Sequence, residues 1–454
     1  MTVLPGGLRV CVESVPQYGR GLAAVALTVA TGGDDDPAGR HGTAHLVEHL
    51  MFPRSGREGS ADPAGEGYAA LVAGAGGVCN AETHRDHTVF HTTVPAELLP
   101  DALSWEAGRL LGFAPKEDVI RTETDVIGEE IRGAGDAGRY WESALGALYP
   151  GSRDSFGTAA ELAGITAGEV EAFFRAHYTA PRMVLSVVGD VDPARVVAVV
   201  REVFAGVVRT AEETRAAEAP RTAREIRAAE APRTAREIRA AEAPRAARET
   251  RAAEAPRAAT EIRTAPLPAA RPGVAVGHPL PDPVADRPAY LAQAVLAQVL
   301  GRSRLPALAR SARDGHRLTS ATVTCGYHGQ WLASAAPDLT LAVLGRAPGT
   351  EVGAAVDIWR SVLRAVADGP LPEAEHRRAV NSLLVAWHRQ ADSLPTRAVA
   401  LGRDALLLPG SAGPDALPAA LRRTTPAEVA AAARALLEGP VTVTELAPQK
   451  GTVG

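Results

Sequence analysis

The stretch HLVEH, residues 45–49, places two histidines four positions apart, with a glutamate directly before the second. On a helix, positions i and i+4 lie one turn apart on the same face, so both imidazole rings can reach one metal ion. Glu48 follows His45 by three residues and is offset from His49 by about 100° around the helix. It can therefore lie beside a water molecule at the metal and act as a general base. Two ordinary helical histidines are the alternative, because so short a pattern also arises by chance.

A catalytic zinc needs three protein ligands, and the stretch ETDVIGEE, residues 123–130, offers a third. Glu123 and Glu130 are seven positions apart and share one face of a predicted helix, with apolar residues between them on the same side. Carboxylates on such a stripe are costly unless they are paired or metal-bound. One of the two could bind zinc while the other orients a ligand histidine. A solvated acidic face is the alternative.

Length and composition exclude several classes of protein. The chain has 454 residues, 46% of them hydrophobic, which is enough for two sizeable cores. The formal net charge of −5 does not indicate a polyanionic partner, and we expect no nucleic acid. Three scattered cysteines do not suggest a disulfide framework. No window approaches the roughly 18 apolar residues of a membrane span, and we expect a cytoplasmic protein that contacts no membrane.

The predicted strands and helices form two similar series. Each series closes with a capped helix followed by a strand, at residues 165–189 and again at 424–446. Between the two, a 12-residue unit, RTAREIRAAEAP with close variants, recurs and carries a proline in each copy. The prolines interrupt any helix, and the repeats hold almost nothing that could fill a core. We therefore predict two related α/β halves, 1–208 and 267–454, joined by a repeat linker at 209–266. A docking arm for a partner is the alternative function of the repeats.

Four motifs, in order and at family-like separations, resemble those of the M16 metallopeptidases, the pitrilysin or insulinase type known as inverzincins. They are HLVEH at 45–49, GGVCNAETHRDHT at 76–88, ETDVIGEE at 123–130 and RMVLSVVGDVDP at 182–193. The similarity to the two-domain M16B form extends from about residue 6 to 205 and continues more weakly from about 270. It implies the α+β LuxS/MPP-like metallohydrolase fold, in which each half is a mixed, mainly antiparallel sheet packed with helices.

The resemblance also implies a role for each matched residue of the first half. His45, His49 and Glu130 would bind one Zn²⁺ per chain. Glu48 would be the general base, and Glu123 the supporting acidic residue of the catalytic site. The second half carries no metal motif.

A substrate-binding strand is implied by a further match. Asn80 and Ala81 fall on the family's NA pair, where an edge strand beside the zinc receives the substrate as an added β-strand. Three histidines follow closely, at His84, His87 and His91. Spacings of three and four in a strand put them on mixed faces, so we interpret them as surface or core histidines.

The second half departs from the family pattern in one respect. The family usually supplies an arginine and a tyrosine there, which hold the substrate carbonyl near zinc. In SRLPALARSARDGHRLTSATV, residues 303–323, the SRL start matches and Arg310 falls on the arginine. No tyrosine follows within this stretch; Arg317 or Leu318 takes its place, and Tyr327 lies too far along. A donor for the developing oxyanion is therefore missing from this chain.

The resemblance implies a zinc-dependent endopeptidase that cleaves short unfolded peptides. Because the tyrosine is missing, we expect a heterodimer in which a second M16-like subunit supplies the arginine and the tyrosine. General peptide clearance and leader removal from ribosomally made peptide natural products are both compatible with this activity. The arginine-rich composition resembles that of actinobacterial proteins and favours leader removal. The alternative is a non-catalytic peptide-binding or assembly subunit. The intact set of His45, Glu48, His49 and Glu130 argues against that alternative.

Overall fold

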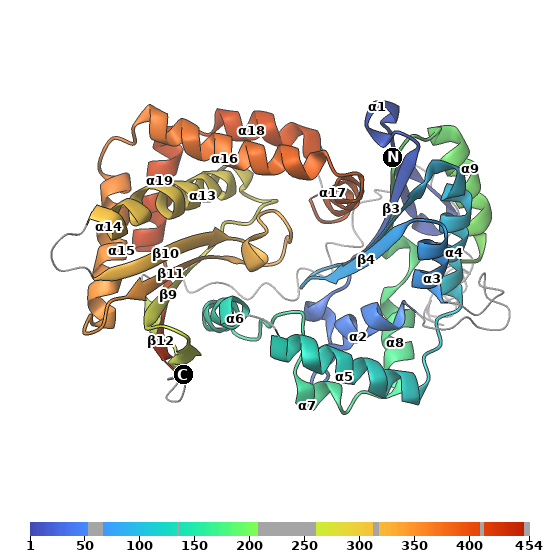
Figure 1. Ribbon diagram of the computed structural model, residues 1–454, viewed down its shortest axis with the longest axis horizontal. Helices are drawn as coiled ribbons and strands as arrows, with labels where there is room; N and C mark the ends of the chain where they lie inside the picture. Colours follow the sequence, from blue (N-terminus) through green and yellow to red (C-terminus); the bar gives the residue numbers. More distant parts are fainter. Residues whose placement is uncertain (53–66, 134–135, 208–259, 312–316, 409–412, 449–454) are drawn as a thin grey trace, which may run out of the picture.

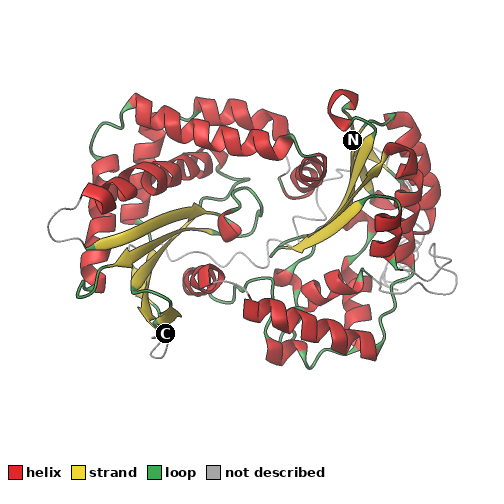
Figure 2. Cartoon of the chain, viewed as in Figure 1, coloured by secondary structure: helices red, strands yellow, loops and turns green. Residues whose placement is uncertain are grey.

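The structure is a computed structural model that describes residues 1–52, 67–133, 136–207, 260–311, 317–408 and 413–448. Two halves lie side by side, and each is a sheet packed with helices (Figures 1 and 2). The prediction of two related α+β halves is thus confirmed. Among the described helices, none is both long and apolar enough to cross a membrane.

The sheet of the first half has six strands in the order β1-β2-β6-β3-β5-β4. These are β1 (Thr2–Val3), β2 (Arg9–Ser14), β3 (Leu22–Val29), β4 (Val78–Thr83), β5 (Thr88–Pro95) and β6 (Met183–Gly189). β2 and β6 run parallel, and the other neighbours are antiparallel. β4 lies at the edge, and within the described residues it pairs only with β5.

Helices of the first half pack on one face of this sheet. They are α2 (Thr43–Leu50), α3 (Tyr68–Gly74), α4 (Leu99–Leu111), α5 (Glu117–Gly133), α7 (Ala159–Leu162), α8 (Ala167–His177) and α9 (Pro193–Val203), whereas the single-turn α1 (Pro16–Gly19) follows the end of β2. Leu46 and Val47 of α2 and Ile127 of α5 join Val25 and Leu27 of β3 in one core. That core places the helix with HLVEH and the helix with ETDVIGEE against each other.

The second half repeats the topology of the first. Its strands lie in the order β10-β11-β9-β12-β7, and β7 and β8 both pair in parallel with β12, whereas the other neighbours are antiparallel. They are β7 (Glu261–Arg263), β8 (Leu267–Ala269), β9 (Gly273–Pro279), β10 (Leu318–Cys325), β11 (Leu339–Arg346) and β12 (Val441–Pro448). Helices of this half are α13 (Arg287–Val299), α14 (Leu305–Ser311), α15 (Val352–Ala367), α16 (Glu373–Ala391), α18 (Leu417–Arg423) and α19 (Pro426–Glu438).

The boundary predicted for the second half, residue 267, is too late. β7 falls inside the predicted linker of 209–266, yet it pairs in parallel with β12 and belongs to the second sheet. Its short EIR sequence resembles the repeats, so composition alone did not separate it from them. The rest of the linker, residues 209–259, lies outside the described residues.

One helix of each half packs against the sheet of the other half. Helix α6 (Asp136–Leu148), from the first half, packs on β9 and β12, and α17 (Leu394–Leu407), from the second, packs on β3 and β6 (Figure 1). As a consequence, alternate residues of β3 are buried on opposite faces of the sheet. Val25 and Leu27 face the helices of their own half, whereas Ala24 and Ala26 face Ala398 of α17. Both sheet faces are buried, which explains the nearly unbroken apolar run of β3.

We predict that Gly402→Ala loosens the exchanged helix α17. A Cβ at this position would lie 2.4 Å from Thr28 Oγ1 and 2.9 Å from Ser186 Oγ, both on the sheet. Overpacking of this kind costs about 1–3 kcal/mol. The matched control is Gly353→Ala on α15, where a Cβ would meet no atom within 4 Å. Calorimetry should show a lower unfolding temperature for the first variant and an equal or higher one for the control; a rise in both would contradict this packing.

Candidate metal centre

Helices α2 and α5 bring the candidate ligands together. Leu46 and Val47 anchor α2 in the core, which leaves the i and i+4 pair, His45 and His49, on one face toward α5. On α5, Ile120, Glu123 and Ile127 are buried at successive turns of one face. Glu130 continues this face one turn further on, with 46% of its side chain exposed.

The geometry of this group fits a tetrahedral metal ion. Oε2 of Glu130 lies 3.5 Å from Nε2 of His45 and 3.6 Å from Nε2 of His49. Ligand atoms of the three residues all lie within 4.8 Å of one another. Ligands about 2.1 Å from a tetrahedral ion are about 3.4 Å apart. The structure therefore brings together the three residues that the resemblance implied as ligands, and two imidazoles with one carboxylate make a donor set suited to zinc.

Hydrogen bonds to the other ring nitrogens hold both imidazoles in place. His49 Nδ1 lies 3.2 Å from Glu123 Oε2, and His45 Nδ1 lies 3.2 Å from the backbone oxygen of Phe156. Each contact favours a proton on Nδ1, which leaves the Nε2 lone pair for a metal. Glu123 is thus placed to act as a supporting residue. The carbonyl of Phe156 was missed by the sequence analysis, because a backbone acceptor has no residue-type signal.

Glu48 lies between the metal group and the edge strand. Oγ1 of Thr83, the last residue of β4, donates a hydrogen bond to Glu48 Oε2. Burial raises the pKa of Glu48, and the charge of His45 and the bond from Thr83 oppose that rise. A carboxylate whose pKa is raised toward neutrality is a more effective general base than an exposed one. Thr83 was also missed, although it stands two residues after the NA pair.

Among the described residues, no strand pairs with the outer edge of β4, and this strand ends beside Glu48. Its residues alternate between exposed and half-buried, and Asn80 is among the exposed ones while Ala81 packs against the core. α2 contacts this strand. An extended peptide can add to such an edge through main-chain hydrogen bonds. Asn80 and Ala81 thus lie on the strand that leads to Glu48.

The three nearby histidines take no part in the metal group. His84 and His87 are buried in the β4–β5 turn with their rings stacked at 4.3 Å, and His91 pairs with Asn80 across the two strands. Burial, together with the charge of His84, lowers the pKa of His87 to about 4. A neutral ring packed in a turn fits their interpretation as structural histidines.

The structure describes only part of the second-half stretch that was compared with the family pattern. Arg310 lies in α14, and its side chain is outside the described part of the structure. Arg304, in the matched SRL start, instead forms an ion pair with Glu375 of α16 at 2.7 Å. Arg317 is exposed, and Leu318 is buried at the start of β10.

Tyr327 lies closer to the metal group than its sequence position suggested. It is 5% exposed, and its hydroxyl is hydrogen-bonded to Ser155 Oγ. Ser155 in turn donates to the backbone oxygen of Thr83 at 2.7 Å. Tyr327 therefore packs between the halves, against the turn that holds His45.

Known proteins resemble both halves of the chain. The family model described as insulinase (peptidase family M16) matches residues 12–132, and the one described as peptidase M16 inactive domain matches 164–383. An uncharacterized zinc protease of Mycobacterium tuberculosis is 33% identical over 208 residues, covering 45% of this chain and 46% of that protein. A mitochondrial-processing peptidase subunit beta of Dictyostelium discoideum is 28% identical over 218 residues, covering 46% of this chain and 44% of that protein. These matches span less than half of each relative.

Solved structures resemble this protein over nearly the whole chain. The alignment with a protease from Helicobacter pylori covers 98% of this chain and 98% of the protease chain, with a TM-score of 0.76 and 19% sequence identity. At that identity the likeness shows the fold alone. Models of one family match both halves, the motifs lie in order, and the fold agrees. The chain belongs to the M16 peptidase family.

Proposed function

We propose that this protein is a zinc-dependent endopeptidase that cleaves short, extended peptides. One observation carries the proposal: the group of His45, His49 and Glu130 stands beside Glu48, at the end of a strand whose outer edge is unpaired within the described parts of the chain. The names of relatives such as the mycobacterial zinc protease support the same activity. The protein would act in the cytoplasm, as the sequence analysis expects.

Three side chains would hold the zinc ion, namely His45, His49 and Glu130. When bound there, zinc polarises the scissile carbonyl and makes a water molecule more acidic. Glu48 then accepts the proton of that water and can pass it to the leaving amine. Thr83 keeps the Glu48 carboxylate oriented for this transfer through its hydroxyl hydrogen bond.

Substrate would bind along β4. Main-chain hydrogen bonds to an edge strand require an extended peptide but place little demand on its side chains. Folded proteins cannot offer a free strand so easily, so the site selects unfolded segments. Leader peptides of ribosomally made natural products have this character, and we propose them as substrates ahead of general peptide clearance.

A second M16-like subunit would complete the site. This chain has no tyrosine at the family position, and its similarity to a mitochondrial-processing peptidase subunit beta supports pairing. The partner would supply the arginine and tyrosine that hold the substrate carbonyl. A non-catalytic assembly role is the second candidate, favoured only by the match of residues 164–383 to a model described as inactive.

Zinc should be lost when a ligand is removed. His49→Ala and Glu130→Gln each delete one of the three donors, so metal analysis of the purified variants should show depletion. The matched control is Glu129→Gln, which alters the neighbouring glutamate that pairs with Arg132 on the solvent side. Full zinc content in both ligand variants would show that the metal is held elsewhere.

Glu48→Gln should keep the metal and lose peptide cleavage. The amide has the shape of the carboxylate but cannot accept the proton, and loss of a general base costs about 10²–10⁴-fold in rate. Turnover measured at equal zinc content tests this step. Cleavage within a few-fold of the unaltered chain would remove Glu48 from the catalytic role.

The isolated chain should cleave slowly, even when fully loaded with zinc. Loss of one donor to the developing oxyanion typically lowers the rate by about 10²–10³-fold. Mixing with an M16-like partner that lacks HxxEH but carries the arginine and tyrosine should restore the rate. Substituting that arginine and tyrosine in the partner is the control and should abolish the gain. Equal rates for the chain alone and for the mixture would rule out a shared site.

A further inference from the structure

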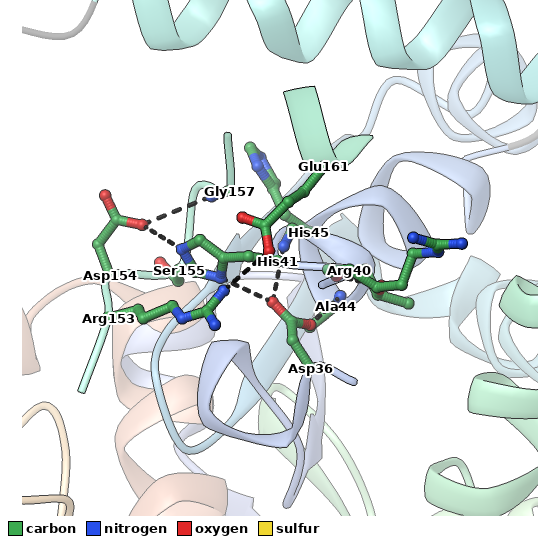
Figure 3. Close-up of polar contacts among 12 residues, drawn as sticks. Asp36, Arg40, His41, Ala44, His45, Arg153, Asp154, Ser155, Gly157 and Glu161 are labelled. Carbon is green, nitrogen blue, oxygen red and sulfur yellow. Dashed lines mark hydrogen bonds and ion pairs between the residues drawn. The ribbon is translucent and has the colours of Figure 1, made fainter. Parts of the chain in front are cut away.

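A buried ion cluster lies behind the metal centre and takes no part in the chemistry described above (Figure 3). His41 is only 2% exposed and stands between two carboxylates. Its Nδ1 lies 3.1 Å from Asp36 Oδ2, and its Nε2 lies 3.1 Å from Asp154 Oδ1. Each aspartate also holds the backbone of a different segment, and both segments lead to the metal ligand His45.

Asp36 caps the helix that carries the ligands. Its two oxygens accept hydrogen bonds from the backbone N–H of Gly42 at 2.7 Å and of Ala44 at 2.8 Å. Gly42, at the N-cap of α2, has no side chain with which to accept these bonds and adopts a φ of 102°. A residue upstream therefore supplies the acceptor that the helix start requires.

Asp154 holds the turn that orients His45. Its Oδ1 accepts a hydrogen bond from the backbone N–H of Phe156 at 3.0 Å, and the carbonyl of the same Phe156 faces His45 Nδ1. The next residue, Gly157, touches α2 directly, since a Cβ there would lie 2.6 Å from the Cα of Gly42. The turn and the helix start thus meet at two glycines, with the ion cluster beside them.

His41 must carry both ring protons to make these contacts. Ionised carboxylates only accept hydrogen bonds, so a ring that bonds to two of them donates from both nitrogens and is an imidazolium. Burial by itself would lower the pKa of His41, but the hydrogen bonds to Asp154 and Asp36 raise it to about 9. Two further carboxylates lie around it. Burial and the charge of Asp154 raise the pKa of Glu142, and the charge of His41 opposes that rise; Glu161 accepts a hydrogen bond from the His41 backbone.

We propose that His41 is a positioning residue for the divalent metal, acting through His45. By joining Asp36 to Asp154, it holds the start of α2 and the Phe156 carbonyl in one fixed arrangement. That arrangement sets the orientation of the His45 ring before the metal binds. The inference rests on the proposed zinc site and adds to it a residue that touches neither metal nor substrate.

The experiment compares the zinc affinity of two buried-histidine variants. Partners that orient a ligand histidine typically change metal affinity by 10–100-fold when altered. His41→Gln, titrated with Zn²⁺ against a chromophoric chelator, should therefore bind zinc 10–100-fold more weakly. The control is His278→Gln in the second half, where a histidine 2% exposed bonds to Trp359. It should lower the unfolding temperature while leaving zinc affinity within twofold.

A spectroscopic readout separates ligand orientation from general stability. Co²⁺ at the same site absorbs in the visible range with a band shape set by ligand geometry, so His41→Gln should shift that spectrum and His278→Gln should not. If His41→Gln fails to fold, Asp154→Asn serves instead, because it keeps the side-chain shape and weakens the same link. Unchanged zinc affinity and spectrum in the folded variant would overturn the inference.

Different results would contradict the proposed function and the role of His41. If the unaltered chain binds no zinc, or cleaves peptides without Glu48, the proposed function itself is wrong. If the unaltered chain binds zinc and depends on Glu48, but His41→Gln and Asp154→Asn bind zinc equally well, only the role of His41 is wrong.

Discussion

The packing of α2 against α5 is the contact on which the rest of the site depends. Apolar residues such as Val47 and Ile127 drive it, since burying each side chain contributes about 1.5–3 kcal/mol. The same contact takes Glu123 out of water, where a carboxylate is stable only with a partner. His49 is that partner. Hydrophobic packing thus assembles a polar group that would be costly in either helix alone.

The two halves share one sheet topology but carry different groups beside their edge strands. In the first half, the edge strand β4 contacts α2, which carries two of the candidate metal ligands. In the second half, β10 occupies the equivalent edge, and the described residues there form no such group. Exchange of α6 and α17 ties the halves into one body, because each sheet needs the other half's helix to bury its second face. The second half therefore buries one face of the first half's sheet, a structural role that is separate from any contact with substrate.

The turn at residues 154–157 is where separate parts of the molecule meet. Through Phe156 it holds His45, and through Ser155 it contacts both the end of β4 and Tyr327 of the second half. The candidate ligand His45, the end of β4 and Tyr327 of the second half therefore all contact this one short turn.

The sequence by itself determined the elements and the chemistry of the ligands. Periodicity predicted the helices and strands, and the i, i+4 histidines with a carboxylate stripe predicted a metal site, because both signals depend on residues near in sequence. Tertiary structure alone decided the contacts made by backbone atoms and by distant segments: the Phe156 carbonyl, Thr83 against Glu48, Asp154 against His41, and β7 in the second sheet. A carbonyl is present at every residue, and contacts between residues 35 or more positions apart leave no local pattern in the sequence, so only folding selects which groups meet.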